Sequence, residues 1–321
     1  MMILLVVSLS LAYAGSERRM GTAGAQELRI PIGARGTAMG GALVAGAGGV
    51  ESIYWNPAGL AHLEGTEAMF SHQPYFADID VNFAGAATNI ADFGTLAGGA
   101  QVVSIGSIDE TTQQFPDGTG RTFSPSLSVL SLTYSRDLTY HVSFGASAKF
   151  INEKIFEASA TGVAFDVGFI YNPNWRGLSL GLAIKNYGPQ MKFSGRGFNR
   201  ELNNRPVSPI SSSFDLPSSF ILGMAYNAIN VEKNSATISG NFVSNNYSQD
   251  NWQGGLEYLY DGKYALRAGY NYSKQNSYLY GFSAGAGVTL SFSGTDITFE
   301  YSWNQTDVFD NTQYFTGKIH F

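Results

Sequence analysis

Residues able to do acid–base or metal chemistry are few in this sequence, and their spacing matches no catalytic or metal-binding pattern. The histidines, His62, His72, His141 and His320, are far apart and no cysteine accompanies them, whereas zinc sites need closely spaced ligands. His141 and Ser143 would share one face of a strand, as a base and a nucleophile must, but serine is common on that face of such strands. We therefore expect no enzyme activity, no metal and no cofactor.

Two further features argue against phosphate chemistry. Gly46-Ala47-Gly48-Gly49 has the glycines of a phosphate-binding loop, but no strand precedes it and no Lys-Ser or Lys-Thr pair follows. The formal net charge is -6, and no basic cluster is dense enough to follow a phosphate backbone. We predict no nucleic-acid partner.

The most unusual stretch runs from Arg29 to Leu63 and precedes every clear strand. It is rich in glycine and alanine and too poor in large apolar side chains to form a core of its own. We expect it to be inserted into a space that the rest of the chain provides. The candidate site residues of its first half are Gly33, Arg35, Gly36, Gly40 and Gly41.

The second half of this stretch contains Trp55-Asn56-Pro57-Ala58-Gly59. Pro57 fixes its own φ and biases Asn56 away from helix, so the chain should turn here. The Asn56 amide can cap the backbone groups freed by the turn. Trp55 adds the large apolar surface that the glycine-rich half lacks, and its indole N–H needs an acceptor, for which an inward Glu or Ser is expected. Trp55 to Ala58 are predicted to anchor the inserted segment, and Gly59 completes the motif.

Composition indicates where the chain resides. Of 321 residues, 14% are aromatic, only 14% are charged, 38 are glycine and none is cysteine. This balance fits an outer-membrane β-barrel better than a soluble β-sandwich or propeller, which would carry more charge on its exposed faces. Residues 1–14 are apolar and end in Ala12-Tyr13-Ala14, which predicts a secretory signal peptide. We expect the outer membrane of a Gram-negative-type bacterium and contact with its lipid.

From about Thr66 onward, apolar and small polar residues alternate with period two, which is typical of strands with one apolar face. The predicted fold is all-β, a transmembrane antiparallel barrel of about 14 strands. The expected strands lie near 66–74, 81–89, 94–105, 126–135, 139–151, 162–172, 177–186, 217–226, 235–243, 251–260, 263–272, 278–292, 295–303 and 313–321. Short and long connections alternate, so we expect both termini on the periplasmic side.

The predicted inner face carries isolated charges, which would be costly to bury unpaired in a narrow lumen. We expect them to pair with one another or with the inserted segment. They are Lys149, Asp166, Lys185, Glu257, Arg267, Glu300 and Lys318. Gly98 and Gly99, adjacent in the third strand, predict either a kink in the wall or a flat surface against which the inserted segment packs.

The longest connection runs from Tyr187 to Asp215 and is locally basic on an acidic protein. Long loops on a rigid scaffold commonly carry recognition. We expect this one outside the cell, as either a recognition loop or an unstructured polar loop. Its basic residues are Lys192, Arg196, Arg200 and Arg205.

The segments Gly33–Ala42 and Tyr54–Leu60 together resemble the corresponding motifs of the PorV/PorQ family, within the wider group of FadL-like outer-membrane proteins. The resemblance implies a fourteen-stranded barrel, residues 66–321, with residues 15–65 forming a hatch in the lumen. It implies type IX protein secretion, with secretion-system proteins or exported cargo as partners, because the motifs resemble PorV/PorQ more closely than FadL. The alternative is FadL-like uptake of hydrophobic small molecules, with Gly98-Gly99 as a lateral opening.

Overall fold

The computed structural model describes most of the chain: residues 21–75, 78–195, 200–202, 205–207, 211–274, 280–306 and 310–321. The predicted signal peptide lies outside the described residues.

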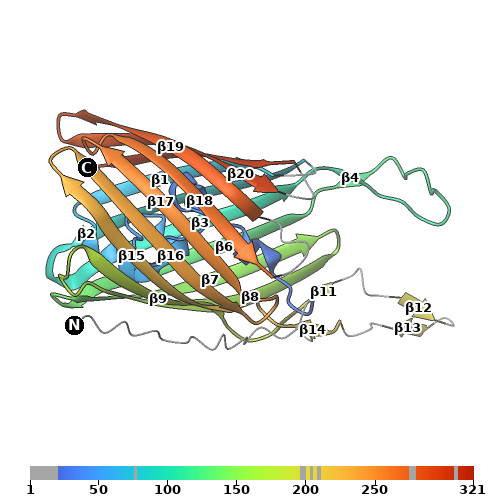
Figure 1. Cartoon of the computed structure of the whole chain (residues 1–321). Helices are drawn as coiled ribbons and strands as arrows, with labels where there is room; N and C mark the ends of the chain where they lie inside the picture. Colours follow the sequence, from blue (N-terminus) through green and yellow to red (C-terminus); the bar gives the residue numbers. More distant parts are fainter. Residues whose placement is uncertain are drawn as a thin grey trace.

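The chain forms a closed, all-antiparallel barrel of fourteen tilted strands (Figure 1). Each strand pairs with its neighbours along the chain, and the first strand pairs with the last, as in Glu67 opposite His320. The barrel strands are β1 (Thr66–Pro74), β2 (Ile79–Ile90), β3 (Gly94–Ile105), β6 (Ser126–Thr139), β7 (Val142–Ile155), β8 (Ala158–Tyr171), β9 (Leu178–Tyr187), β15 (Ser219–Val231), β16 (Asn234–Asn245), β17 (Asn251–Tyr260), β18 (Tyr264–Ser273), β19 (Tyr280–Phe292), β20 (Thr295–Thr306) and β21 (Thr312–His320).

These are the strands that the alternation predicts, so the expected fold is confirmed. Most extend a few residues beyond the predicted limits, as β6 does, reaching Thr139. The two-residue turn Ser293-Gly294 has both φ values positive, at 46° and 91°, as a type I′ hairpin requires. Closure leaves no unpaired strand edge in the barrel wall.

The outer surface of the barrel is apolar and the inner surface polar. Leu132 is 66% exposed and Leu266 62% exposed, whereas Ser147 and Lys149 are buried. Aromatic side chains ring both ends on the outside, with Tyr140 and Phe292 near one end and Tyr187 and Tyr272 near the other. Such an apolar band between aromatic girdles is the surface of a barrel that lies in a lipid bilayer.

The two ends differ in their connections. At the end we call the short-turn end, strands are joined by brief turns such as 232–233 and 293–294; the long-loop end carries 106–125 and 188–218. The first of these long loops holds the hairpin β4 (Ile108–Asp109) and β5 (Thr122–Phe123), which projects beyond the barrel (Figure 1).

The described N-terminal segment runs through the lumen. Its elements are η2 (Gln26–Arg29), α1 (Ala34–Ala38), α2 (Ser52–Trp55) and η3 (Pro57–His62). Ala23 pairs with Asp215 of the second long loop, whereas Thr66 and Phe321 bond to each other at the short-turn end. Residue 21, the first described, and the C-terminus therefore lie at opposite ends. The N-terminus itself lies outside the described residues, so the expectation that both termini are periplasmic stays a prediction. None of the described helices is long and apolar enough to cross a membrane.

The second long loop folds back at its base. There β10 (Met191–Lys192) pairs with β14 (Ser213–Phe214), and β11 (Ser194–Gly195) adds to β8. A further hairpin joins β12 (Arg200–Leu202) to β13 (Arg205–Val207). Met191 is buried with Leu28 of the lumen segment, so the base of this loop covers part of the long-loop end.

Candidate functional site

The lumen segment, residues 21–65, is called the hatch here. It approaches the barrel wall so closely that the wall carries glycine at many of the closest contacts. A Cβ at Gly145 would overlap Pro57, one at Gly168 would overlap Asn56, and one at Gly269 would overlap Met39. Seven inward glycines, on β7 to β9, β15 and β17 to β19, lie against the hatch in this way, and we call them the glycine belt: Gly145, Gly168, Gly181, Gly223, Gly255, Gly269 and Gly285.

Several belt glycines are direct partners across strands. Gly145 lies opposite Gly168, Gly181 opposite Gly223, and Gly255 opposite Gly269. Glycine pairs weaken a sheet because they contribute no packed side chains. Here they leave room for the hatch backbone, which takes over the contacts that wall side chains would otherwise make.

Glycines of the hatch also lie at close approaches. Gly36 faces the indole of Trp55 within the hatch, where a Cβ would overlap the ring, and Gly40 faces the backbone of Tyr270 on wall strand β18. Gly33, Gly40 and Gly41 have φ of 79°, 64° and 87°, which favours glycine. These four of the predicted hatch glycines therefore lie where a side chain would not fit or would be strained.

Asn56 forms hydrogen bonds with other hatch residues and with the wall. Its side chain is fully buried; Oδ1 accepts a hydrogen bond from the Ala58 N–H at 3.1 Å, and Nδ2 donates to Val44 O at 2.8 Å and to Phe169 O of β8 at 3.2 Å. The first of these bonds caps η3. The Trp55 indole N–H donates to the backbone O of Ile32 at 3.2 Å, so its acceptor is the hatch itself and not a wall Glu or Ser as expected.

The remaining motif residues lie beside Asn56. Pro57 is the first residue of η3 and touches the belt at Gly145. Ala58 O accepts from the Ser135 hydroxyl of β6 at 3.2 Å. Gly59 lies against Ala47 O, where no side chain fits.

Six ionic groups, four of them buried and two partly buried, join the hatch to four wall strands. Arg35 of α1 donates through Nε and Nη2 to both Glu257 oxygens, at 2.9 and 3.0 Å. Arg267 bonds the same carboxylate at 2.6 Å and reaches Glu300 at 2.9 Å. Lys318 lies 2.8 Å from Glu300 and 3.4 Å from hatch residue Glu51. We call this set the charge network: Arg35, Glu51, Glu257, Arg267, Glu300 and Lys318.

Three cations and three carboxylates make up the charge network, so in its fully ionised form it is neutral. Burial alone would lower the pKa of Arg35, but the adjacent Glu257 raises it above the ordinary value, so Arg35 stays charged. Burial raises the pKa of Glu51 above that of a free carboxyl, against the opposing fields of Lys318 and Arg35. The sequence analysis did not identify Glu51 as a site residue, although an isolated acidic residue in a glycine-rich segment could have indicated an ionic contact with the wall.

Of the seven inward charges expected to pair, six do so. Lys149 pairs with Asp166 and donates to Asn186 Oδ1 at 2.8 Å, and the other four belong to the charge network. Among the described residues, Lys185 of β9 has no carboxylate partner; its ammonium lies 3.4 Å from the centroid of the Tyr54 ring.

Gly98 and Gly99 do not interrupt the wall. Their pairing with Ala86 and Gly85 of β2 and with Leu132 and Ser131 of β6 is continuous. The hydrogen-bonded ladder is therefore unbroken here, and a lateral opening at this place stays a prediction. The inward Phe83 ring covers Gly99, where a Cβ would lie 2.8 Å from it, whereas a Cβ at Gly98 would meet only Ser131 O at 3.8 Å. Close packing accounts for Gly99.

The basic loop is described only in part. Lys192 is exposed on β10, and the backbones of Arg200 and Arg205 belong to the β12–β13 hairpin. Arg196 lies outside the described residues. What this loop recognises stays a prediction.

A serine, a histidine and an aspartate do meet at the short-turn end, but not as a catalytic triad. The Ser143 hydroxyl donates to Asp137 at 2.5 Å and lies 3.2 Å from His62 Nε2. The same His62 nitrogen lies 3.9 Å from Asp137, whereas a triad needs the two imidazole nitrogens to face different partners. His141 bonds the Asn172 carbonyl instead. The described residues contain no group of three or more metal-ligating side chains.

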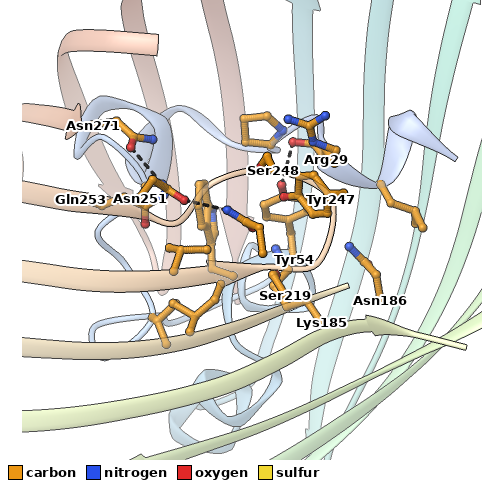
Figure 2. A pocket seen from close by; sticks show the side chains of 18 residues that line it. Arg29, Tyr54, Lys185, Asn186, Ser219, Tyr247, Ser248, Asn251, Gln253 and Asn271 are labelled. Carbon is orange, nitrogen blue, oxygen red and sulfur yellow. Dashed lines mark hydrogen bonds between the residues drawn. The ribbon is translucent and has the colours of Figure 1, made fainter. Parts of the chain in front are cut away.

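Two lumen cavities flank the hatch. The first, about 230 Å³, lies toward the long-loop end, and Gly41, Val44 and Lys185 line it (Figure 2). The second, about 570 Å³, lies toward the short-turn end and is lined by Met39, Leu43, Gly46 and Arg35. Both are bounded by the same four strands, β9, β15, β16 and β17. Hatch residues 39–46 touch both cavities and so form the barrier between them.

Sequence reasoning missed the polar residues of the first cavity, since they are separated by up to 242 positions along the chain and come together only in the barrel. They include Arg29, Tyr54, Asn245, Tyr247, Asn251 and Asn271. The alternation of β16 to β18 placed the asparagines on the inner face, which was the available signal.

Comparison with known proteins bears on the fold. The sequence matches no protein-family profile and no curated protein. Solved structures do match it: the Pseudomonas putida toluene transporter TodX has a TM-score of 0.58 and 14% identity, covering 90% of this chain and 97% of that one. The Ralstonia pickettii toluene transporter TbuX gives 0.53 and 15%, covering 90% and 97%, and a Pseudomonas aeruginosa FadL homologue gives 0.52 and 14%, covering 90% and 98%.

This is the fold of FadL-type outer-membrane barrels. The FadL-type neighbours are channels and transporters by their descriptions, not enzymes. The resemblance to PorV/PorQ finds no counterpart among these structures.

The charge network should behave as one unit. Replacing Glu257 by Gln leaves a net positive charge buried beside Arg35 and Arg267, at a cost of about 3–5 kcal/mol. Adding Arg35→Met restores neutrality, so the double variant should lose less free energy of unfolding than the two single variants together, measured by urea titration in phospholipid. Glu110→Gln, which breaks an exposed ion pair in the projecting hairpin, is the control and should change little. If the double variant instead loses the sum of the free energies of unfolding lost by the two single variants, the groups act independently.

Asn56 should hold the lumen closed. Asn56→Ala removes the cap of η3 and leaves buried groups unsatisfied at a cost of about 1–3 kcal/mol, while the closed wall persists. In a planar bilayer, wild-type protein should be silent and Asn56→Ala should conduct. Asn234→Ala, which loses only a bond to Tyr258 on the outer side, should stay silent. Free conduction by wild type would mean that the hatch is no plug.

Proposed function

We propose that this protein is an outer-membrane transporter that passes small hydrophobic molecules through its lumen after movement of the hatch. The observation that carries the proposal is the pair of cavities aligned along β9, β15, β16 and β17, with hatch residues 39–46 between them. The FadL-type fold supports it, since TodX and TbuX are described as toluene transporters. In this proposal the long-loop end faces outward, and the C-terminus, at the short-turn end, faces the periplasm.

Movement of hatch residues 39–46 is required because they form the barrier. Two side-chain hydrogen bonds hold them among the described residues: Asn241 Nδ2 donates to Gly41 O at 2.9 Å, and Asn56 Nδ2 donates to Val44 O at 2.8 Å. Their other contacts with the wall are packing against the glycine belt, as between Met39 and Gly269. The wall around them need not change, because every barrel strand is paired on both sides. The mechanism therefore uses a local displacement inside a rigid barrel.

A reversible crosslink tests this movement. A Cβ at Gly46 would lie 3.9 Å from Ala225 Cβ of β15, which is disulfide geometry, and the chain has no other cysteine. Cells expressing wild type should accumulate radiolabelled toluene faster than cells with an empty vector. The oxidised Gly46→Cys/Ala225→Cys variant should lose that gain, and a reductant should restore it. Uptake no faster than in empty-vector cells, with the barrel folded in the membrane, would refute the function; uptake unaffected by the crosslink would refute hatch movement.

Type IX secretion is the second candidate, and the hatch motif resembling PorV/PorQ favours it. In this reading the hatch stays shut, and the long-loop end, including the basic 188–218 loop, holds exported proteins. Deleting the gene in a host with a working type IX system should then remove proteins from the cell surface and medium. An unchanged set of exported proteins would rule this candidate out.

A further inference from the structure

Two carboxyl groups face each other where the hatch first meets the wall, toward the long-loop end. Glu27 lies on η2 and is 1% exposed, and Glu153 lies on the inner face of β7 and is 5% exposed. Their side chains are within hydrogen-bonding distance of each other. A carboxylate only accepts hydrogen bonds, so two carboxyl groups bond to each other when one of them holds a proton. We call these two groups the carboxyl pair.

The surroundings of the carboxyl pair are apolar. Leu28, next to Glu27, belongs to one buried cluster with Val129 of β6, Ile151 of β7 and Met191 of β10. An ionised carboxylate is costly to bury in such surroundings, and a second one beside it adds repulsion. Burial and the adjacent Glu153 together raise the pKa of Glu27 to about 8, so Glu27 keeps its proton at neutral pH.

No cation compensates the carboxyl pair in the part of the chain that the structure describes. Both Glu27 oxygens and one Glu153 oxygen are buried there without a hydrogen-bond donor. The other charged groups on the elements packed against η2 are engaged elsewhere or exposed: Lys149 and Asp166 pair with each other, Asp215 accepts from Gln190, Arg29 lies over the Tyr247 ring, and Lys154 and Lys192 are exposed. The proton is therefore what makes the contact favourable.

The carboxyl pair joins η2 to the wall beside the first cavity. Leu28 and Arg29 of η2 line that cavity. The side chains of Gln26 and Arg29 form hydrogen bonds within the segment, whereas Glu27 reaches across to β7. Displacement of η2 would thus open the cavity toward the long-loop end.

We propose that Glu27 and Glu153 share one proton and act as a pH-dependent latch, which holds η2 against β7 when protonated and releases it when the proton is lost. On release the O–H bond of Glu27 breaks, the proton passes to water, and the two carboxylates separate into solvent. The inference goes beyond the proposed transport function and rests on it only for what the opened cavity admits.

The sign of the pH dependence follows from proton binding. In the released segment Glu27 faces water and has its ordinary pKa of 4.5, against about 8 when held. Between these two values the held state binds one proton more than the released state, so each pH unit shifts the equilibrium about tenfold toward release. The contribution of the latch is fully present below the lower value and is lost above the upper one.

A spin label on Gln26→Cys tests the latch, because Gln26 is exposed on η2 and the chain has no other cysteine. The full-length mature protein in phospholipid vesicles, with a folded barrel verified by gel mobility without heating, is followed by electron paramagnetic resonance from about pH 5 to about pH 9. The ratio of mobile to immobile label should rise about tenfold per pH unit and level off above about pH 8. Glu27→Gln, whose amide donates to Glu153 at any pH, should keep the label immobile throughout. Glu157→Gln, which removes an exposed carboxyl at the same end, should leave the pH dependence intact.

A label mobility that is constant across this range, or that changes equally in Glu27→Gln, would overturn the proposal. A label that is mobile at every pH in Glu27→Gln would also overturn it, because an amide donor would then fail to replace the shared proton. So would immobilisation by added calcium at about pH 9, since the two carboxylates would then form a cation site. The measurement needs no solute, so a failed latch leaves the transport function standing, and an absence of toluene uptake leaves the latch standing.

Discussion

The close approach of two backbones, the hatch and the wall, is the constraint on which the rest of this structure depends. Fourteen strands enclose a space too narrow for a plug and a full layer of wall side chains together. The glycine belt removes that layer where the hatch passes, and the hatch has a glycine of its own at the contact between Gly40 and the backbone of Tyr270. The hatch alone would lack a core, and the wall alone would be weakened by its glycines. Packed together, the two form one core.

Polar contacts then fix the register of the hatch against the wall. The bidentate bond from Arg35 to Glu257 and the multiple bonds of Asn56 are directional, whereas packing against glycine is not. The six groups of the charge network sum to zero charge when all are ionised, so they stabilise the contact between the hatch and the wall. Lys185 lies outside the charge network, and its Nζ lies 3.4 Å from the centroid of the Tyr54 ring instead.

The sequence predicted the fold nearly strand by strand, because alternation along a barrel wall is local information. It also identified Asn56 and Trp55, whose residue types suit a turn and an apolar anchor. It could not identify the cavity, since Arg29, Lys185 and Tyr247 meet only once the barrel closes. β1 was hard to read for a related reason: Met69 points inward, as Phe83 of β2 does, and packs in the hatch core with Ile53 and Leu60. At Gly99 close packing explains the glycine, whereas the lateral opening expected at Gly98 and Gly99 stays a prediction.

The path of the hatch through the lumen also constrains the order of assembly. The segment lies in the lumen and continues directly into β1, so its covalent link to the wall is at the first strand. β21, the last strand made, supplies Thr316 to the Ala34 N–H and Lys318 to Glu51, and the same strand closes the wall against β1. Closure of the barrel and attachment of the hatch therefore both depend on β21. A chain without its last strand would lack the pairing with β1 and these contacts to the hatch.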